Sequence, residues 1–297
     1  MHTWKRMSIE EKTFRAVGYT LITGFAILCL IPFLIIIASS FSSESYIIQH
    51  GYGLIPGDFT LESYASIFKN PASVFRAYGV TTVVTVVGTI GGIFINTMTG
   101  YVLQRKDFPW RNKFSFYFFF TTLFSGGLVP WYILCIKYLK LGNSLLALIL
   151  PTMVSVWNIL LVKGFMAGIP FEITESGKID GGRRLSNFCS VNPASCKTCY
   201  RNNWTFTALT YWNDWYNSML FITDENLYSL QYLLYKLVGS AQEMRRIMDE
   251  TGMNMDVVPV ESMKMALTVV VTGPIILLYP FVQKYFVKGL TVGAVKG

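Results

Sequence analysis

Residues 16–38 read AVGYTLITGFAILCLIPFLIIIA, a run that contains no Asp, Glu, Lys or Arg. About 20 apolar residues in a helix are enough to cross the ~30 Å hydrocarbon core of a bilayer. Lys5, Arg6, Lys12 and Arg15 precede the run, so it also has the outline of a secretory signal peptide. The run is longer than the apolar part of such a peptide, and no clear small-x-small cleavage site follows it. We therefore expect an uncleaved membrane anchor.

The rest of the chain repeats this pattern. Of its 297 residues, 52% are hydrophobic and only 14% are charged, whereas about a quarter of the residues in a soluble domain are charged. A soluble protein with a large core is disfavoured, because its apolar residues would alternate with polar faces. The sequence predicts an all-α membrane protein, one transmembrane domain over residues 1–297 with six transmembrane helices. The expected spans are 16–38, 78–103, 114–136, 145–162, 204–222 and 265–287.

Basic residues set the expected orientation. The net charge is +8, and most of the 25 Lys and Arg residues fall on one side of the membrane if the N-terminus is cytoplasmic. Cytoplasmic loops carry an excess of Lys and Arg, so we expect both termini to be cytoplasmic. The long outer loop Thr223–Ser262 is amphipathic, and it is either a solvated cap or a docking surface for an extracellular partner.

Glycine and proline interrupt several expected spans. They occur at Gly88, Gly91 and Gly92, at Gly126, Gly127 and Pro130, and at Gly273, Pro274 and Pro280. Small residues let helices approach closely, and broken helices are tolerated beside protein or a water-filled cavity. At each of these positions, there are two interpretations: the residue allows close packing of helices, or it belongs to a moving gate.

The loop between the fourth and fifth spans, residues 164–203, carries the most informative motif. Residues 169–182 read IPFEITESGKIDGG. This stretch resembles the EAA loop of importer permeases, E-A-A-x-x-D-G-A followed by F-x-x-I-x-L-P-x-x-x-P. Glu175, Asp180 and Gly181 match in register, whereas Gly177 departs from the alanine of the pattern. The resemblance implies that Glu175, Asp180 and Gly181 contact an ATPase subunit, where a carboxylate can pair with a partner's arginine.

The resemblance extends over nearly the whole chain. Residues 207–216, TALTYWNDWY, are similar to the fifth-span signature of the maltose-type sugar permeases, and 283–297 are similar to that family's ending. The closest similarity is to the branch that serves complex oligosaccharides in Gram-positive bacteria. It implies the architecture of a type I ATP-binding-cassette (ABC) importer permease in the bacterial cell membrane. It also implies four partners: a second homologous permease, an ATPase dimer, an extracellular solute-binding lipoprotein and a carbohydrate substrate.

Four residues of the fifth span are candidates for the substrate path: Trp212, Asn213, Asp214 and Trp215. Polar and ionisable groups inside an apolar segment are functional candidates, and aromatic faces can pack against sugar rings. An interfacial aromatic belt is the alternative interpretation of the tryptophans.

The chain has no phosphate-binding G-x-x-x-x-G-K-[ST] loop and no apparent catalytic triad. We therefore expect no enzymatic activity and no cofactor, and ATP must be bound by a partner subunit. A polytopic membrane enzyme or scaffold without transport is the alternative. It would need a clustered acid, base or nucleophile at the membrane face.

Residues 182–205, GRRLSNFCSVNPASCKTCYRNNWT, depart from the family pattern. Permitted codons read one nucleotide later give AGDYRIFVRLILPLAKPVIATIGL, which restores the pattern without a gap, so we infer two compensating single-base shifts. As printed, the segment predicts an irregular or poorly determined backbone across 183–203, a fifth span that begins near Trp204, and weak or absent transport. A metal or redox site at Cys196-x-x-Cys199 is the alternative, but no second C-x-x-C motif exists, and we expect no metal.

Overall fold

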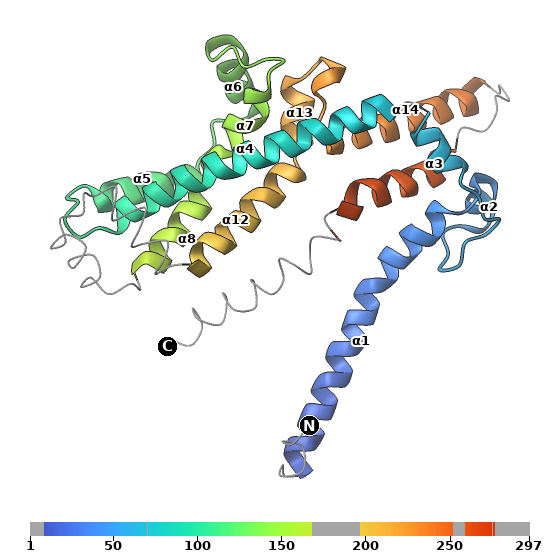
Figure 1. Cartoon of the computed structure of the whole chain (residues 1–297), viewed down its shortest axis with the longest axis horizontal. Helices are drawn as coiled ribbons and strands as arrows, with labels where there is room; N and C mark the ends of the chain where they lie inside the picture. The colour runs from blue at the N-terminus through green and yellow to red at the C-terminus, as the bar shows by residue number, and fades with distance from the viewer. Residues whose placement is uncertain (1–8, 70, 168–196, 252–258, 275, 277–297) are drawn as a thin grey trace. The chain divides into compact units, whose positions relative to one another are not determined.

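The computed structural model describes residues 9–69, 71–167, 197–251, 259–274 and 276 (Figure 1). Helices dominate these residues, and no β-strand occurs among them beyond one isolated bridge between Ser42 and Phe59. The chain divides into two compact units. The first comprises residues 1–70 and 236–273, and the second comprises 71–235 and 274–297.

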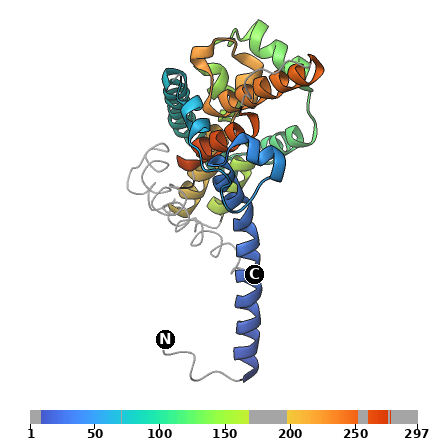
Figure 2. The same cartoon turned by 90° about the vertical axis from the view of Figure 1, so that its right-hand side faces the viewer.

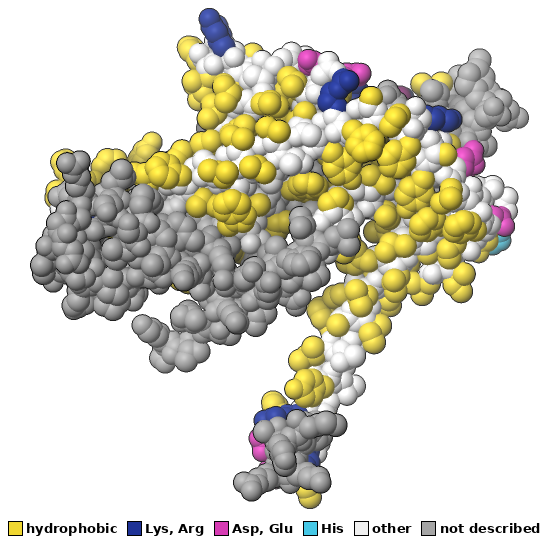
Figure 3. All heavy atoms as spheres, viewed as in Figure 1, with side chains coloured by type: hydrophobic (Ala, Val, Ile, Leu, Met, Phe, Trp, Pro, Cys, Tyr) yellow, Lys and Arg dark blue, Asp and Glu magenta, His cyan; other side chains and the backbone are white. Residues whose placement is uncertain are grey.

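The first unit begins with α1 (Ile9–Ser40), one continuous helix of 32 residues with Pro32 inside it (Figure 2). Hydrophobic side chains lie along its length (Figure 3), and only its last residues, Ala38, Ser39 and Ser40, are buried. The helix contains the expected span 16–38. Its length and apolar composition suit it to cross a membrane, where lipid or protein would cover the exposed side chains.

A buried carboxylate organises the rest of the first unit. Two short helices, α2 (Glu44–His50) and α3 (Glu62–Ile67), follow α1, and a further helix covers residues 260–274. The Glu44 carboxylate accepts hydrogen bonds from the backbone N–H groups of Glu261 and Ser262 at 2.8–3.0 Å and from the Ser262 hydroxyl at 2.9 Å. A carboxylate satisfies the free N–H groups at a helix start and suits its positive dipole end, so Glu44 fixes α2 to helix 260–274.

The second unit is built around α4 (Pro71–Gln104), a helix of 34 residues that contains the expected span 78–103. It packs against α12 (Lys197–Trp212), α7 (Leu145–Met153) and α8 (Val156–Ala167), as Figure 1 shows. Glycines on α4 permit this approach. A Cβ added at Gly88 would lie 2.4 Å from the Tyr211 ring, and one at Gly100 would lie 2.7 Å from the Val162 side chain. These positions therefore have a packing role.

The third and the fourth expected spans are each divided into a bent pair of helices. The segment 114–136 divides into α5 (Arg111–Leu123) and α6 (Leu128–Ile133), which continues into the π-helix η2 (Leu134–Tyr138), with a bend of 114° between them. The segment 145–162 divides into α7 and α8, which meet at 44°. By length and composition, α1, α4 and these two bent pairs give up to four membrane spans within the described residues. The count of six spans stays a prediction.

The fifth expected span, 204–222, differs from the prediction at its start and in its middle. Helix α12 begins at Lys197 and not near Trp204, so residues 197–203 are helical in the structure, and residues 183–196 lie outside the described part. The helix ends at Trp212, and α13 (Tyr216–Phe221) follows after a break. The 3-10 helix η4 (Glu225–Leu227) and α14 (Leu230–Thr251) come next. Of the last expected span, 265–287, residues 265–274 lie in a helix.

A side-chain amide bridges the break between α7 and α8. Asn96, fully buried on α4, donates from Nδ2 to the Met153 carbonyl at 3.2 Å and accepts at Oδ1 from the Ser155 N–H at 3.0 Å. Both backbone groups lie where the helical ladder is interrupted. Asn96 therefore replaces hydrogen bonds that water cannot supply in this interior.

Asn96→Leu should destabilise the protein, because it leaves two buried backbone groups without partners at about 1–3 kcal/mol each. The measurement is the midpoint of thermal unfolding of the detergent-purified chain. Thr210→Val is the matched control, because Thr210 is exposed on α12 and its hydroxyl bonds only its own helix, at Phe206. Equal midpoints for Asn96→Leu and the wild type would contradict this role.

Asn203 marks a second buried polar position, within the segment whose reading frame is in question. Its side chain is 0% exposed, its Oδ1 accepts from the Thr207 hydroxyl at 3.3 Å, and its Nδ2 has no partner among the described residues. A buried amide N–H without a partner is destabilising. The reading one nucleotide later permits isoleucine at this position.

Asn203→Ile should raise the unfolding midpoint, because it removes an unsatisfied buried donor whose cost is about 1–3 kcal/mol. The same thermal assay measures it. Asn203→Ala serves as the control, because it removes the amide without supplying the apolar volume. A midpoint for Asn203→Ile at or below that of the wild type would show that the amide belongs in this core.

Candidate functional site

The break between α12 and α13 contains the four residues predicted for the substrate path, and Asp214 shapes the turn. Its two carboxylate oxygens accept from the Asn217 backbone N–H at 3.1 Å and from Asn217 Nδ2 at 2.6 Å. The Asp214 carbonyl also accepts from the Ser229 hydroxyl at 3.0 Å. Asp214 thereby satisfies an N–H group at the start of α13, as an N-cap side chain does. Its carboxylate is engaged within the turn.

Asn213, the other polar residue of the break, is exposed. Its Nδ2 donates to the Leu209 carbonyl at 3.0 Å, and its Oδ1 accepts from Gln231 Nε2 at 3.2 Å. Gln231 lies at the start of α14, so the amide pair connects the end of α12 to α14. Sequence reasoning missed Gln231, because its partner lies 18 residues away along the chain.

The two tryptophans lie against different elements. The Trp212 ring centroid is 6.5 Å from that of Tyr78 on α4, and its indole N–H has no partner among the described residues. The Trp215 ring is stacked on Tyr235 of α14, with centroids 4.8 Å apart and planes 23° apart. The structure therefore packs the rings of Trp212 and Trp215 against two different helices, α4 and α14.

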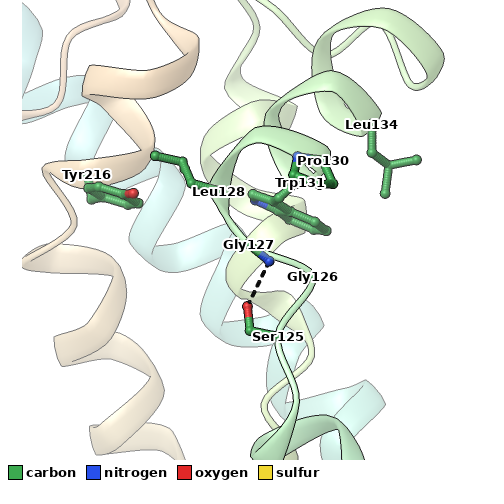
Figure 4. A pocket seen from close by; sticks show the side chains of 8 residues that line it. All are labelled: Ser125, Gly126, Gly127, Leu128, Pro130, Trp131, Leu134 and Tyr216. Atoms are coloured by element: carbon green, nitrogen blue, oxygen red, sulfur yellow. Dashed lines mark hydrogen bonds between the residues drawn. The ribbon is translucent and has the colours of Figure 1, made fainter.

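A pocket of about 500 Å³ lies where the break in the third expected span meets the start of α13. Its wall consists of Ser125, Gly126, Gly127, Leu128, Pro130, Trp131, Leu134 and Tyr216. Figure 4 shows Tyr216 of α13 across from Leu128 and Trp131 of α6. Volumes of 300–1,000 Å³ are typical of small-molecule sites. Irregular backbone at membrane depth is found where it lines a cavity or is covered by protein.

Glycine creates the sharp bend beside this pocket. Gly127 has φ +88°, a left-handed conformation that costs glycine little, and its N–H donates to the Ser125 hydroxyl at 3.2 Å. The sequence had singled out Gly126, Gly127 and Pro130 as interruptions, and the structure places all three in the pocket wall. Trp131 and Tyr216 were missed, although both are aromatic residues close to a helix break.

The predicted coupling residues Glu175, Asp180 and Gly181 lie in 168–196, outside the described residues. Within the described part, no group of three or more His, Cys, Asp or Glu residues is placed to hold a metal ion. Cys29 and Cys135 are free thiols there.

Several known proteins are similar in sequence to this chain over nearly its whole length. The polygalacturonan/rhamnogalacturonan transport system permease protein YtcP of Bacillus subtilis is 35% identical over 97% of this chain and 100% of its own length. Protein LplC of Bacillus subtilis is 34% identical over 96% of each chain. The arabinooligosaccharides transport system permease protein AraQ of Halalkalibacterium halodurans is 26% identical over 97% of this chain and 100% of its own. No protein-family model matches the chain.

The fold is also shared with a solved structure. A crystal structure of a bacterial ABC transporter involved in the import of the acidic polysaccharide alginate contains a chain with a TM-score of 0.79 and 23% identity, which covers 94% of this chain and 99% of that one. The predicted class, an all-α membrane protein with the architecture of an ABC importer permease, is confirmed, and so is the family resemblance. This chain belongs to the family of membrane-spanning permease subunits of bacterial ABC importers for sugars and oligosaccharides.

Proposed function

We propose that this chain is one of two membrane-spanning subunits of an importer that moves an oligosaccharide into the cell. The observation that carries the proposal is the full-length similarity to a permease named for polygalacturonan and rhamnogalacturonan transport. The pocket supports it, because two helix breaks and two aromatic side chains, Trp131 and Tyr216, meet there.

This chain would form part of the translocation path for the carbohydrate. Other subunits would deliver the carbohydrate and hydrolyse ATP. We propose that an extracellular solute-binding lipoprotein delivers the carbohydrate to the outer face, which includes Thr223–Ser262. A second homologous permease would close the path, and an ATPase dimer would bind ATP. The ATPase partner is proposed because the sequence has no phosphate-binding loop. The excess of basic residues between the apolar runs supports six spans with both termini in the cytoplasm.

The coupling of ATP hydrolysis to transport would run through the loop 164–203. Glu175 and Asp180 offer carboxylates for a partner's basic residues, and Gly181 permits a tight turn between two short helices. We further propose that the chain is not an enzyme. Its relatives are named as transport permeases, and Asp214, the acidic residue of the fifth expected span, is bonded to Asn217.

Proteoliposomes that contain the complete importer should take up labelled oligogalacturonides or arabino-oligosaccharides when ATP and the binding protein are both present. The chain as printed should transport weakly. The version with 182–205 read one nucleotide later should transport at least about tenfold faster, because it restores the apolar face that docks on the ATPase. Resequencing the gene tests the frame itself.

The control omits the binding protein and should abolish uptake. If the frame-restored importer neither accumulates any of these sugars nor hydrolyses ATP faster with loaded binding protein, the chain is not an importer subunit for this class of substrate.

Glu175→Lys should lower uptake at least about tenfold without lowering the amount of protein in the membrane, because it replaces an attraction for the ATPase by a repulsion. Uptake and binding-protein-stimulated ATP hydrolysis are both measured in the complete importer. Glu172→Lys is the matched control, since it makes the same charge change three residues before Glu175, where the E-A-A-x-x-D-G pattern begins. Normal uptake by Glu175→Lys would remove Glu175 from the coupling site.

A further inference from the structure

The end of α8 leads into the loop 164–203, which the proposed function assigns to the ATPase, and this end is packed on the end of α4. Val162 and Met166 of α8 are 0% and 1% exposed, and they pack against the buried ring of Tyr101 on α4. Gly100 lets the two helices approach, since an added Cβ there would lie 2.9 Å from a backbone oxygen of α8. A glycine contact brings helices close, but it places no side chain that opposes sliding between them.

A buried arginine completes this contact. Arg105 follows the last residue of α4 and is 9% exposed. Its Nη1 donates to the Tyr101 hydroxyl at 2.8 Å, and its guanidinium carbon lies 5.5 Å from the centre of the Tyr101 ring. Its Nε and Nη2 donate to the two carboxylate oxygens of Asp107 at 2.8 and 2.5 Å. We call Arg105, Asp107 and Tyr101 the arginine cluster.

Stability alone does not account for the arginine cluster. Burying an ion pair costs desolvation that roughly cancels its attraction, and apolar residues of similar volume are often equally stable. A guanidinium instead defines orientation, because its donors form a planar, rigid fork. Here that fork holds the Asp107 carboxylate and the Tyr101 hydroxyl in one geometry. The cluster therefore fixes the direction of the ring against which α8 packs.

The other end of α8 is attached to the same helix. Asn96 on α4 bonds the Ser155 N–H, and α8 begins at the next residue, Val156. Because α8 is held to α4 at both ends, sliding of one helix over the other is opposed. A displacement that enters α8 at Ala167 is then passed to α4 and to the α7–α8 break.

We propose that Arg105 is a positioning residue of the transport cycle, which locks α8 to α4 so that the ATPase moves both helices through the loop 164–203. The inference rests on the proposed function and adds the route that its coupling step takes within this chain. Energetic coupling between distant sites is carried by packed side chains and hydrogen-bond networks. Without the arginine cluster, ATP is still hydrolysed, but fewer hydrolysis cycles move a sugar.

The double variant Arg105→Met with Asp107→Asn tests this role, because it removes both charges and leaves no unpaired buried charge. The readout is the number of ATP molecules hydrolysed per labelled oligogalacturonide or arabino-oligosaccharide taken up by the complete, frame-restored importer in proteoliposomes. This ratio should rise at least about threefold, as expected for loss of one coupling contact. The thermal unfolding midpoint should stay within about 4 °C of the parent, since such replacements are often nearly neutral.

Tyr101→Phe is the second variant, because it keeps the ring against α8 and removes only the hydroxyl that Arg105 holds. It should raise the ratio about twofold. The matched control is Arg15→Met with Glu11→Gln, which removes an exposed ion pair on α1, outside the second unit, and should leave the ratio unchanged.

An unchanged ratio in the double variant would overturn the inference even if uptake fell, because a cluster that only stabilises the fold lowers hydrolysis and uptake together. If the double variant does not reach the membrane, the ratio of Tyr101→Phe decides in the same way. An unchanged ratio with normal uptake by the parent would leave the importer function standing. If the parent takes up no sugar, the proposed function fails, and the inference falls with it.

Discussion

The rest of the structure depends on one constraint: in a hydrocarbon interior, each backbone N–H and C=O must find a partner within the protein. Continuous helices such as α1 and α4 meet this constraint along their length. The three breaks between described helices of the second unit interrupt the backbone hydrogen bonds. At each break, a polar side chain forms a hydrogen bond with a backbone group in place of the helical one. Asn96 bonds both sides of the α7–α8 break, Asp214 bonds the start of α13, and the Ser125 hydroxyl accepts the Gly127 N–H.

The helices beside two of these breaks, α7, α8 and α12, pack closely against α4. Tyr211 lies against Gly88, where any side chain would collide with the ring, and its hydroxyl donates to the Ile149 carbonyl at 2.7 Å. Val162 and the Ile159 carbonyl come similarly close to Gly100. Such contacts hold α12, α7 and α8 to one scaffold.

The same breaks connect the fold to transport. A helix that stops and restarts exposes backbone, and the bend at Gly127 opens the wall of the pocket beside Trp131. The break at 213–215 turns Trp215 toward α14 and places Tyr216 at the pocket.

The sequence by itself determined the membrane class, the helical fold and the family, because long apolar runs and short motifs are local properties of the chain. It also located the interruptions at Gly126, Gly127 and Pro130, and it singled out Asn213 and Asp214 as polar residues of the fifth span without predicting the helix break there. It did not show that α12 begins at Lys197, since polar residues there argued against a helix in lipid. Only the tertiary structure decided that Asn96 bridges a break 57 residues away, that Trp215 stacks on Tyr235, and that Tyr216 and Trp131 line the same pocket. The physical reason is that hydrogen bonds and ring contacts between distant segments depend on how helices pack, and apolar runs alone leave that packing undetermined.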